Sequence, residues 1–220
     1  MIDTEPSPEQ LVVAVFDFDH TLTNRDSLMP FLHMVAGRWR FLWGLLRTSP
    51  ALVGYMLKVI PNWKAKEAVL AHVLAGLTTE QLQTLGQRFA IQKIPTLLKQ
   101  EAVDRLRWHQ SQGHQTIVVS ASLEAYLAPF AKAMEIDHVL GTQLVEHSGC
   151  LTGQIQGQNC YGPEKVRRLQ ALLGNLKRYC VYAYGDSRGD RELLAAANFP
   201  YYRQFHDPAT RLHASEPLMK

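Results

Sequence analysis

Three short apolar runs, each ending abruptly in polar residues, constrain the fold of this chain more than any other feature. They are LVVAVF at residues 11–16, TIVV at 116–119 and YCVYAY at 179–184. Such runs lack the alternation of a half-exposed strand and are typical of parallel strands that are covered on both faces. A shorter run, IDHVL at 136–140, predicts a fourth strand.

The chain between these strands has helical patterns, at residues 97–110, 123–134 and 163–173. Ser122 is expected to cap the second helix, and Pro163 lies at a first-turn position of the third. Strands that alternate with helices predict an α/β fold with a doubly wound parallel sheet. Residues 144–145 and 151–155 flank the turn-like EHSGC and predict a β-hairpin insert.

One segment, residues 27–90, does not fit this alternation. It holds apolar helical material that we expect to be broken at Pro50 and Pro61, and it directly follows the first strand. Loops at the carboxyl ends of strands surround the ligand crevice of an open α/β sheet. We therefore expect a helical cap over 27–90 and a core of 1–26 and 91–220, with an unusually long crossover as the alternative.

Polar residues that can carry chemistry follow the apolar runs. Asp17 and Asp19 flank one residue after the first strand, and carboxylates this close repel each other unless a cation or a proton intervenes. Such a pair suits magnesium but could equally cap a turn. Asp186 and Asp190 follow another strand in GDSRGD, which adds two carboxylates at an equivalent level of the sheet.

Two further residues point to an anion at the same edge. Ser120 ends the 116–119 run, where its hydroxyl and the next helix N-terminus could hold an anionic oxygen. Lys165 lies in the first turn of a predicted helix, which is electrostatically unfavourable for a cation unless an anion lies nearby.

The ordered set DFDHT, Ser120, Lys165 and GDSxxxD resembles the four motifs of the haloacid dehalogenase (HAD) superfamily of phosphohydrolases. The resemblance covers roughly residues 12–199 and is strongest to the phosphoserine-phosphatase-like branch (subfamily IB), which has a helical cap after the first motif. It implies a Rossmann-like core. It also implies that Asp17 attacks phosphorus to form an aspartyl-phosphate, and that Asp19 protonates the leaving group and then activates water.

The resemblance also implies a cofactor and a phosphate-binding pair. Mg²⁺ would be held by the Asp17 carboxylate, the Asp19 backbone carbonyl and Asp186, with Asp190 orienting this shell. Ser120 and Lys165 would bind the phosphoryl oxygens. A carboxylate at position 19 suits a phosphatase or phosphomutase, and the helical insert favours a phosphatase with a small substrate.

The substrate is expected to be chosen by the cap. Asp26 matches a position where phosphoserine phosphatases carry a glutamate that contacts the substrate amino group, although it could instead cap the next helix. His72 lies near the place of a substrate-binding cap arginine, and His20 could touch the leaving group. Ala121-Ser122 replaces the glycine pair of that branch. We expect a small phosphomonoester, such as phosphoserine or a related amino-alcohol phosphate.

The cap segment is also basic and aromatic. Residues 27–76 contain six basic side chains but only Glu67 as an acid, interleaved with Trp39, Trp43 and Trp63. The aromatics could form the core of the cap, or they could meet an anionic lipid surface. The segment is similar to cap segments of phosphatidylglycerophosphatase C. The alternative function is therefore a lipid-phosphate phosphatase, of that kind or acting on lysophosphatidate, at a membrane surface.

Composition sets the remaining expectations. The net charge of +3 is mild, and with no recognition motif it does not favour nucleic acid as a partner. No apolar run is long enough to span a membrane, the first ten residues do not resemble a signal peptide, and the three cysteines lack metal-site spacing. We expect a cytoplasmic protein, with peripheral contact at the inner membrane face as an option. A non-catalytic phosphate-binding protein would be expected to have lost Asp17 or Asp19.

Overall fold

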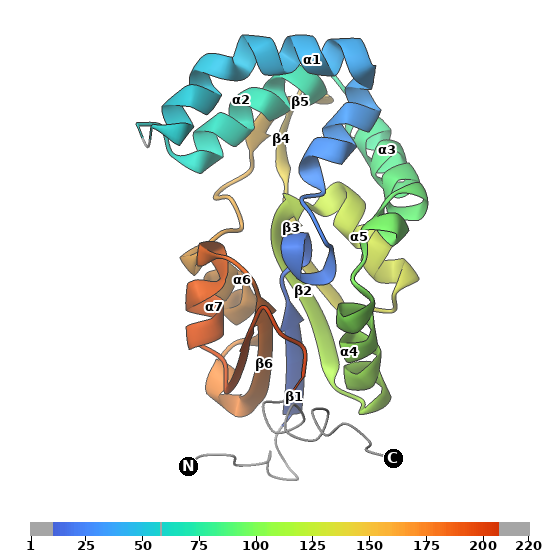
Figure 1. The fold of residues 1–220 in the computed structure, drawn as a ribbon, viewed down its shortest axis with the longest axis vertical. Helices are drawn as coiled ribbons and strands as arrows, with labels where there is room; N and C mark the ends of the chain where they lie inside the picture. Colours follow the sequence, from blue (N-terminus) through green and yellow to red (C-terminus); the bar gives the residue numbers. More distant parts are fainter. Residues whose placement is uncertain (1–10, 58, 207–220) are drawn as a thin grey trace, which may run out of the picture.

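The centre of the fold is a five-stranded parallel sheet with the strand order β3-β2-β1-β6-β7 (Figure 1). The computed structural model describes residues 11–57 and 59–206. The strands are β1 (Leu11–Phe16), β2 (Gln115–Leu123), β3 (His138–Thr142), β6 (Tyr179–Gly185) and β7 (Phe199–Tyr202). All four predicted strands are present, but β7 was not predicted. The strand order reverses at β1, which places the expected ligand crevice between β1 and β6.

Helices cover both faces of this sheet. They are α4 (Gln100–Ser111) and α5 (Glu124–Ala133) on one face, and α6 (Pro163–Leu173) and α7 (Arg191–Ala195) on the other (Figure 1). Alternate side chains of β1 belong to two separate core clusters, with Phe16 in the first and Val15 in the second. Val15 packs in the cluster that contains Leu169 of α6 and Leu193 of α7. The doubly wound α/β fold predicted from the apolar runs is therefore confirmed.

Within residues 11–57 and 59–206, four single-turn helices link these elements. They are η1 (Phe18–Leu22), a π-helix, and the 3₁₀ helices η2 (Ile94–Leu97), η3 (Leu176–Arg178) and η4 (Arg188–Asp190). The helix predicted over 97–110 begins later than expected. Leu97 ends η2, and Leu98 adopts an extended conformation and pairs with Thr23 in an isolated β-bridge, so α4 starts only at Gln100.

The insert between β1 and β2 is helical, as predicted, and contains α1 (Leu28–Met56), α2 (Asn62–Leu74) and α3 (Thr79–Gln92). The expected break at Pro50 is wrong, because α1 continues through this residue. Proline cannot donate to the carbonyl four residues earlier, but that carbonyl, of Leu46, accepts a hydrogen bond from Ser49 Oγ instead. The interruption in α1 is at Gly37, whose φ of 70° lies outside the helical region.

The predicted hairpin is present as β4 (Leu144–His147) and β5 (Cys150–Ile155), and it packs against α2. A Cβ at Gly153 would lie 2.2 Å from Cα of Ala71, so only glycine allows this approach. The Ile155 amide donates to Glu67 Oε1 at 2.8 Å. The helices α1 and α2 and this hairpin, here called the α1–α2 layer, lie beyond the carboxyl ends of the sheet strands (Figure 1).

The third helix of the insert packs differently. A Cβ at Gly86 of α3 would lie 2.1 Å from the Ala125 carbonyl oxygen of α5, and the rings of Phe31, Phe89 and Tyr126 form a cluster between α1, α3 and α5. The core and cap boundaries drawn from the sequence stay predictions, and α3 packs against α5 of the core.

No helix within residues 11–57 and 59–206 is long and apolar enough to cross a bilayer. The expectation about a signal peptide concerns residues 1–10, outside the described residues.

Candidate active site

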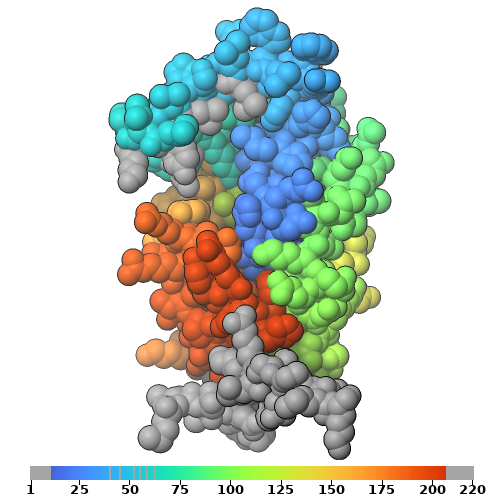
Figure 2. All heavy atoms as spheres, viewed as in Figure 1, coloured from blue at the N-terminus to red at the C-terminus, as the bar shows by residue number. Residues whose placement is uncertain are grey.

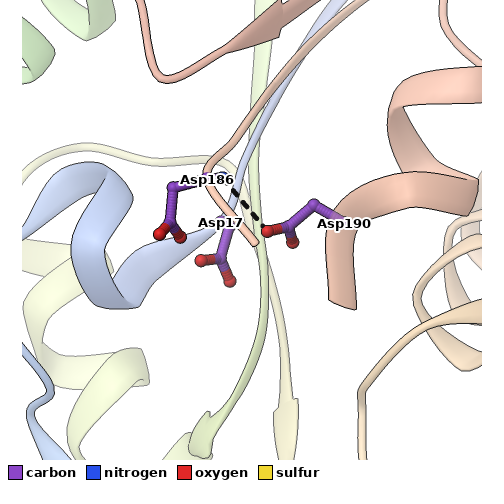
Figure 3. Close-up of side chains that lie close together, drawn as sticks. All are labelled: Asp17, Asp186 and Asp190. Carbon is purple, nitrogen blue, oxygen red and sulfur yellow. Dashed lines mark hydrogen bonds between the residues drawn. The ribbon is translucent and has the colours of Figure 1, made fainter. Parts of the chain in front are cut away.

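Three carboxylates converge where β1 and β6 end. Asp17 directly follows β1, and its amide donates to the Tyr184 carbonyl at 2.9 Å, which extends the pairing of these two strands. Figure 3 shows Asp17, Asp186 and Asp190 with their carboxylates close together, and each offers an oxygen within 4.8 Å of the others. Parallel strands that end at one edge of a sheet bring these sequence-distant residues together, as predicted.

Lys165 of α6 neutralises part of this cluster. Its Nζ lies 2.5 Å from Asp17 Oδ1 and 2.6 Å from Asp190 Oδ1, and all three side chains are buried. Pro163 occupies the first turn of α6, as expected from the sequence. The unfavourable position of a cation in a first helical turn is therefore explained by two carboxylates. Burial by itself would lower the pKa of Lys165, but Asp17 and Asp190 raise it, so the amine stays protonated.

Asp190 also holds the loop that carries Asp186. Its Oδ2 accepts hydrogen bonds from the amide of Asp186 at 3.1 Å, the amide of Ser187 at 3.0 Å and Ser187 Oγ at 2.8 Å. A Cβ at position 185 would lie 2.5 Å from Asp190 Cβ, which explains the glycine there. Asp190 therefore links Lys165 to the backbone of the loop that carries Asp186.

The electrostatics of the cluster suit a divalent cation. Burial raises the pKa of Asp17 to about 6 even though Lys165 opposes it, and burial together with Asp190 raises the pKa of Asp186. Burial would also raise the pKa of Asp190, but Lys165 holds it below its usual value. Lys165 pairs with Asp17 and Asp190, while His20, Arg203 and Lys99 act on Asp186 at longer range. A hard cation bound by the oxygens of the three carboxylates would relieve the remaining repulsion. The residues present fit a Mg²⁺ site.

Asp19 lies in a different environment from Asp17, although only Phe18 separates them. Its Oδ1 accepts from the Ser27 amide at 2.8 Å, and its Oδ2 accepts from Ser122 Oγ at 2.5 Å. Burial, and next the charge of Asp26, raise the pKa of Asp19 to about 7. The carboxyl group therefore exchanges a proton easily near neutral pH, which is the property of a general acid and base.

The segment after Val119 corrects two predictions about serines. β2 does not end there but continues to Leu123, and its pairing with β3 shifts between Val119 and Leu123, so Ser120 lies in a bulge of the strand. Ser122 does not cap α5, because Leu123 occupies the N-cap position. The Ser122 side chain instead donates to Asp19, and its amide donates to Ser120 Oγ at 3.1 Å.

The three residues expected to contact substrate occupy different places. Asp26 is exposed and accepts from the Met29 amide at 2.9 Å, so it forms the capping contact while remaining near Asp19. His20 is exposed in η1 with a φ of 60°, and its charge acts on Asp186. His72 lies against Gly44 of α1, and its described contacts do not bring it to the carboxylates.

Lys66 of α2 is a site residue that the sequence reasoning missed. Its Nζ donates to the Ala121 carbonyl at 2.5 Å and to Asn159 Oδ1 at 2.9 Å, which ties the α1–α2 layer to the bulge after Ser120. Burial lowers the pKa of Lys66 to about 8, against the opposing effect of Asp19 and Asp26. A signal existed in the sequence, because helical spacing places Lys66 on the same face as the buried residues Val69 and Leu70.

Buried carboxylates and a lysine at the switch point of a doubly wound sheet define the active site of an α/β enzyme. The family model for haloacid dehalogenase-like hydrolases matches residues 14–195. The chain belongs to this family, and the resemblance inferred from its four motifs is confirmed.

Individual relatives agree with this assignment. Protein CicA of Caulobacter vibrioides is 39% identical over 203 residues, which cover 91% of this chain and 89% of CicA. A protein of unknown function from Bordetella pertussis has a similar crystal structure, with a TM-score of 0.77 and 28% identity, covering 93% of this chain and 95% of that one. A phosphoserine phosphatase structure with a phospho-aspartyl intermediate analogue shares the fold, with a TM-score of 0.56, 18% identity and coverage of 86% and 84%.

Proposed function

We propose that the protein is a Mg²⁺-dependent phosphatase that hydrolyses a small phosphomonoester through an aspartyl-phosphate on Asp17. The observation that carries this proposal is the contrast between Asp17 and Asp19. Asp17 is ion-paired with Lys165, whereas Asp19 accepts hydrogen bonds from Ser27 and Ser122 and has a pKa near 7. The ammonium beside Asp17 favours the ionised carboxylate that a nucleophile requires, and the buried site of Asp19 raises its pKa, as a general acid requires.

In the first step, an oxygen of ionised Asp17 forms a bond to phosphorus as the bond to the ester oxygen breaks. Asp19 gives its proton to the departing alkoxide. In the second step, Asp19 takes a proton from water, the water oxygen attacks phosphorus, and Asp17 leaves as a carboxylate. Each step transfers one proton, so Asp19 returns to its starting state after every cycle.

Positive charge and hydrogen-bond donors stabilise the transferring group. An ammonium has three N–H donors, of which Lys165 gives two to Asp17 and Asp190, so its third can bind a phosphoryl oxygen. The Ser120 hydroxyl, at the same edge of the sheet, is the second donor. Mg²⁺ bound by Asp17, Asp186 and the Asp19 carbonyl would offset the negative charge on the phosphoryl oxygens.

The charged groups near Asp19 favour a substrate that carries one negative and one positive group in addition to its phosphate. The ammonium of Lys66 and the carboxylate of Asp26 both act electrostatically on Asp19, and they carry opposite charges. Lys66 could pair with a substrate carboxylate, and Asp26 could pair with an amino group. This combination supports phosphoserine or a related amino-alcohol phosphate as the substrate class.

Hydrolysis of p-nitrophenyl phosphate tests the reaction, and a panel of natural esters tests the substrate. We expect Mg²⁺-dependent release of phosphate by the wild type and a loss of activity in Asp17→Asn. Equal rates for these two proteins would refute Asp17 as the nucleophile, whereas no hydrolysis by the wild type would support a protein that only binds phosphate. Asp104→Asn is a suitable control, because this exposed carboxylate of α4 bonds only to Gln100 among its described contacts.

The second candidate is a lipid-phosphate phosphatase, and one observation favours it: the tryptophans Trp39 and Trp43 of the α1–α2 layer are exposed. A panel containing phosphoserine, histidinol phosphate, sugar phosphates, lysophosphatidate and phosphatidylglycerophosphate separates the two candidates. A preference for an amino-alcohol phosphate would contradict the lipid candidate, whereas a preference for acyl-bearing esters would contradict the small-substrate proposal.

A further inference from the structure

Large apolar side chains are exposed together at the end of the molecule formed by α1 and the start of α2. Figure 2 shows this end uppermost, in blue and cyan. Trp39 is 73% exposed, Trp43 63% and Trp63 42%. The set, here called the α1 face, consists of Trp39, Leu42, Trp43, Leu46, Val53, Met56, Leu57, Val59 and Trp63.

These side chains lie on the outward side of their helices and do not pack inside the protein. In the part of α1 after Gly37, two positions that approach other segments are glycines, because a Cβ at Gly44 would lie 2.4 Å from the His72 ring and one at Gly54 would lie 2.6 Å from Ile60. The large residues at 39, 42, 43 and 46 recur at helical spacing on the outward side. The interpretation that the aromatics form a core of the cap holds for Phe31, which is buried, but is wrong for the tryptophans, and contiguous apolar surface of this kind marks an interaction site.

The charges around the α1 face are positive. Arg38 and Lys64 are exposed beside Trp39 and Trp63, with cation–ring distances of 6.0 and 5.4 Å, and Arg47 is exposed on the same helix. Glu67, the acid of residues 27–76, lies about one helical turn after Trp63 and accepts a hydrogen bond from the Ile155 amide. The charges beside the α1 face are thus three exposed cations and one carboxylate that is already bonded to the backbone, so the net charge there is positive.

We propose that the α1 face docks onto the surface of an anionic lipid bilayer. Exposed Trp and Leu beside Arg and Lys, on a helix that cannot span a membrane, match the chemistry of a bilayer interface, where apolar side chains enter between headgroups and cations meet lipid phosphates. A second copy of this chain is a poorer occupant, because it would place two positive faces opposite each other. Docking is independent of the proposed hydrolysis.

Flotation of the full chain with lipid vesicles tests this proposal. We expect the wild type to float with phosphatidylcholine–phosphatidylserine vesicles at about 0.1 M salt, and to float much less with phosphatidylcholine alone or at about 1 M salt. Asp17→Asn should float like the wild type, which separates docking from catalysis. Absence of flotation with the anionic vesicles at low salt would overturn the proposal.

Matched variants locate the surface. Leu46→Glu places a charge on a residue that is 63% exposed, and Ile91→Glu does the same on α3 at a residue that is 65% exposed. Leu46→Glu should reduce bound protein at least about ten-fold and Ile91→Glu should not, while both keep the wild-type rate on p-nitrophenyl phosphate. If Leu46→Glu fails to fold, Arg47→Glu replaces it, with an expected loss of about five-fold or more. Equal vesicle binding by Leu46→Glu and Ile91→Glu would contradict docking of the α1 face onto lipid. So would a wild-type protein that binds no vesicles but forms a dimer that Leu46→Glu dissociates.

Discussion

Lys165 Nζ lies 2.5 Å from Asp17 Oδ1, and both side chains are buried at the carboxyl end of β1. The same nitrogen lies 2.6 Å from Asp190 Oδ1. This bridge joins three segments that are far apart in the sequence and sets the charge of the site before any substrate arrives. It fixes Asp17, the proposed nucleophile, and also the loop that carries Asp186, so its removal should affect both activity and folding.

Lys165→Met is expected to lower the free energy of unfolding by about 3–5 kcal/mol, because it leaves two buried carboxylates without their cation. Urea unfolding of the metal-free protein measures this loss. Lys64→Met, which removes an exposed lysine of α2, should change stability by less than about 0.5 kcal/mol. Equal stability of the two variants would show that the buried bridge does not hold the loops together.

Asp186→Asn is expected to weaken Mg²⁺ binding by about ten-fold or more, because it removes one of three converging carboxylates. Mg²⁺ that binds only the folded state should also raise the melting temperature of the wild type, and this shift should be smaller in the variant. The thermal shift is measured without substrate and so does not depend on activity. A variant with an unchanged Mg²⁺ requirement and an unchanged shift would place the metal elsewhere.

Lys66→Gln is expected to lower kcat/KM for phosphoserine by about ten-fold or more relative to p-nitrophenyl phosphate, because the proposed partner of the substrate carboxylate is lost. Lys64→Gln is the matched control, since it removes an exposed amine two residues earlier on the same helix. Equal losses for both esters would assign Lys66 to tethering α2 rather than to substrate choice.

His109 is expected to make the fold sensitive to acid. Burial, and next the charges of Arg105 and His114, lower its pKa from 6.5 to about 3, and its Nε2 lies 2.8 Å from the Tyr184 hydroxyl. The unfolded chain therefore binds a proton below pH 6.5 that the folded protein does not, so stability falls with pH from 6.5 down to about 3. At pH 5 this loss is about 2 kcal/mol.

Urea unfolding at about pH 7.5 and pH 5 measures this loss, with His109→Gln as the comparison. The variant should lose less stability than the wild type between these two conditions, whatever its stability at the higher pH. Parallel losses in both proteins would assign the acid sensitivity to other groups.

Much of the fold and of the acidic cluster could be predicted because neither depends on detailed packing. The LVVAVF run gave β1 with the bounds that the structure has, and strands ending at one edge of a sheet bring Asp17 and Asp186 together. β7 was missed because FPYY is only four residues long and contains a proline, so its strand character comes from pairing with β6. Pro50 misled the prediction because Ser49 satisfies the carbonyl that the proline leaves free.

The contacts around Asp19 could not be predicted, because they depend on where loops meet. Ser122 has the composition of a helix cap, and only the bulge in β2 turns its hydroxyl toward Asp19. Lys66 could have been noticed on an otherwise apolar helix face, but its partners, the Ala121 carbonyl and Asn159, lie about 55 and 93 residues away in the sequence.

The most direct test of the central claim is to trap the phosphorylated enzyme. Wild type and Asp19→Asn are mixed with substrate and Mg²⁺ and quenched in acid, and the peptide that contains Asp17 is examined by mass spectrometry. The account predicts one phosphoryl group on Asp17 and its absence in Asp17→Asn, with turnover in Asp19→Asn slowed by about 10²–10⁴-fold. Undiminished hydrolysis by Asp17→Asn, or a phosphoryl group on another residue during turnover, would contradict it.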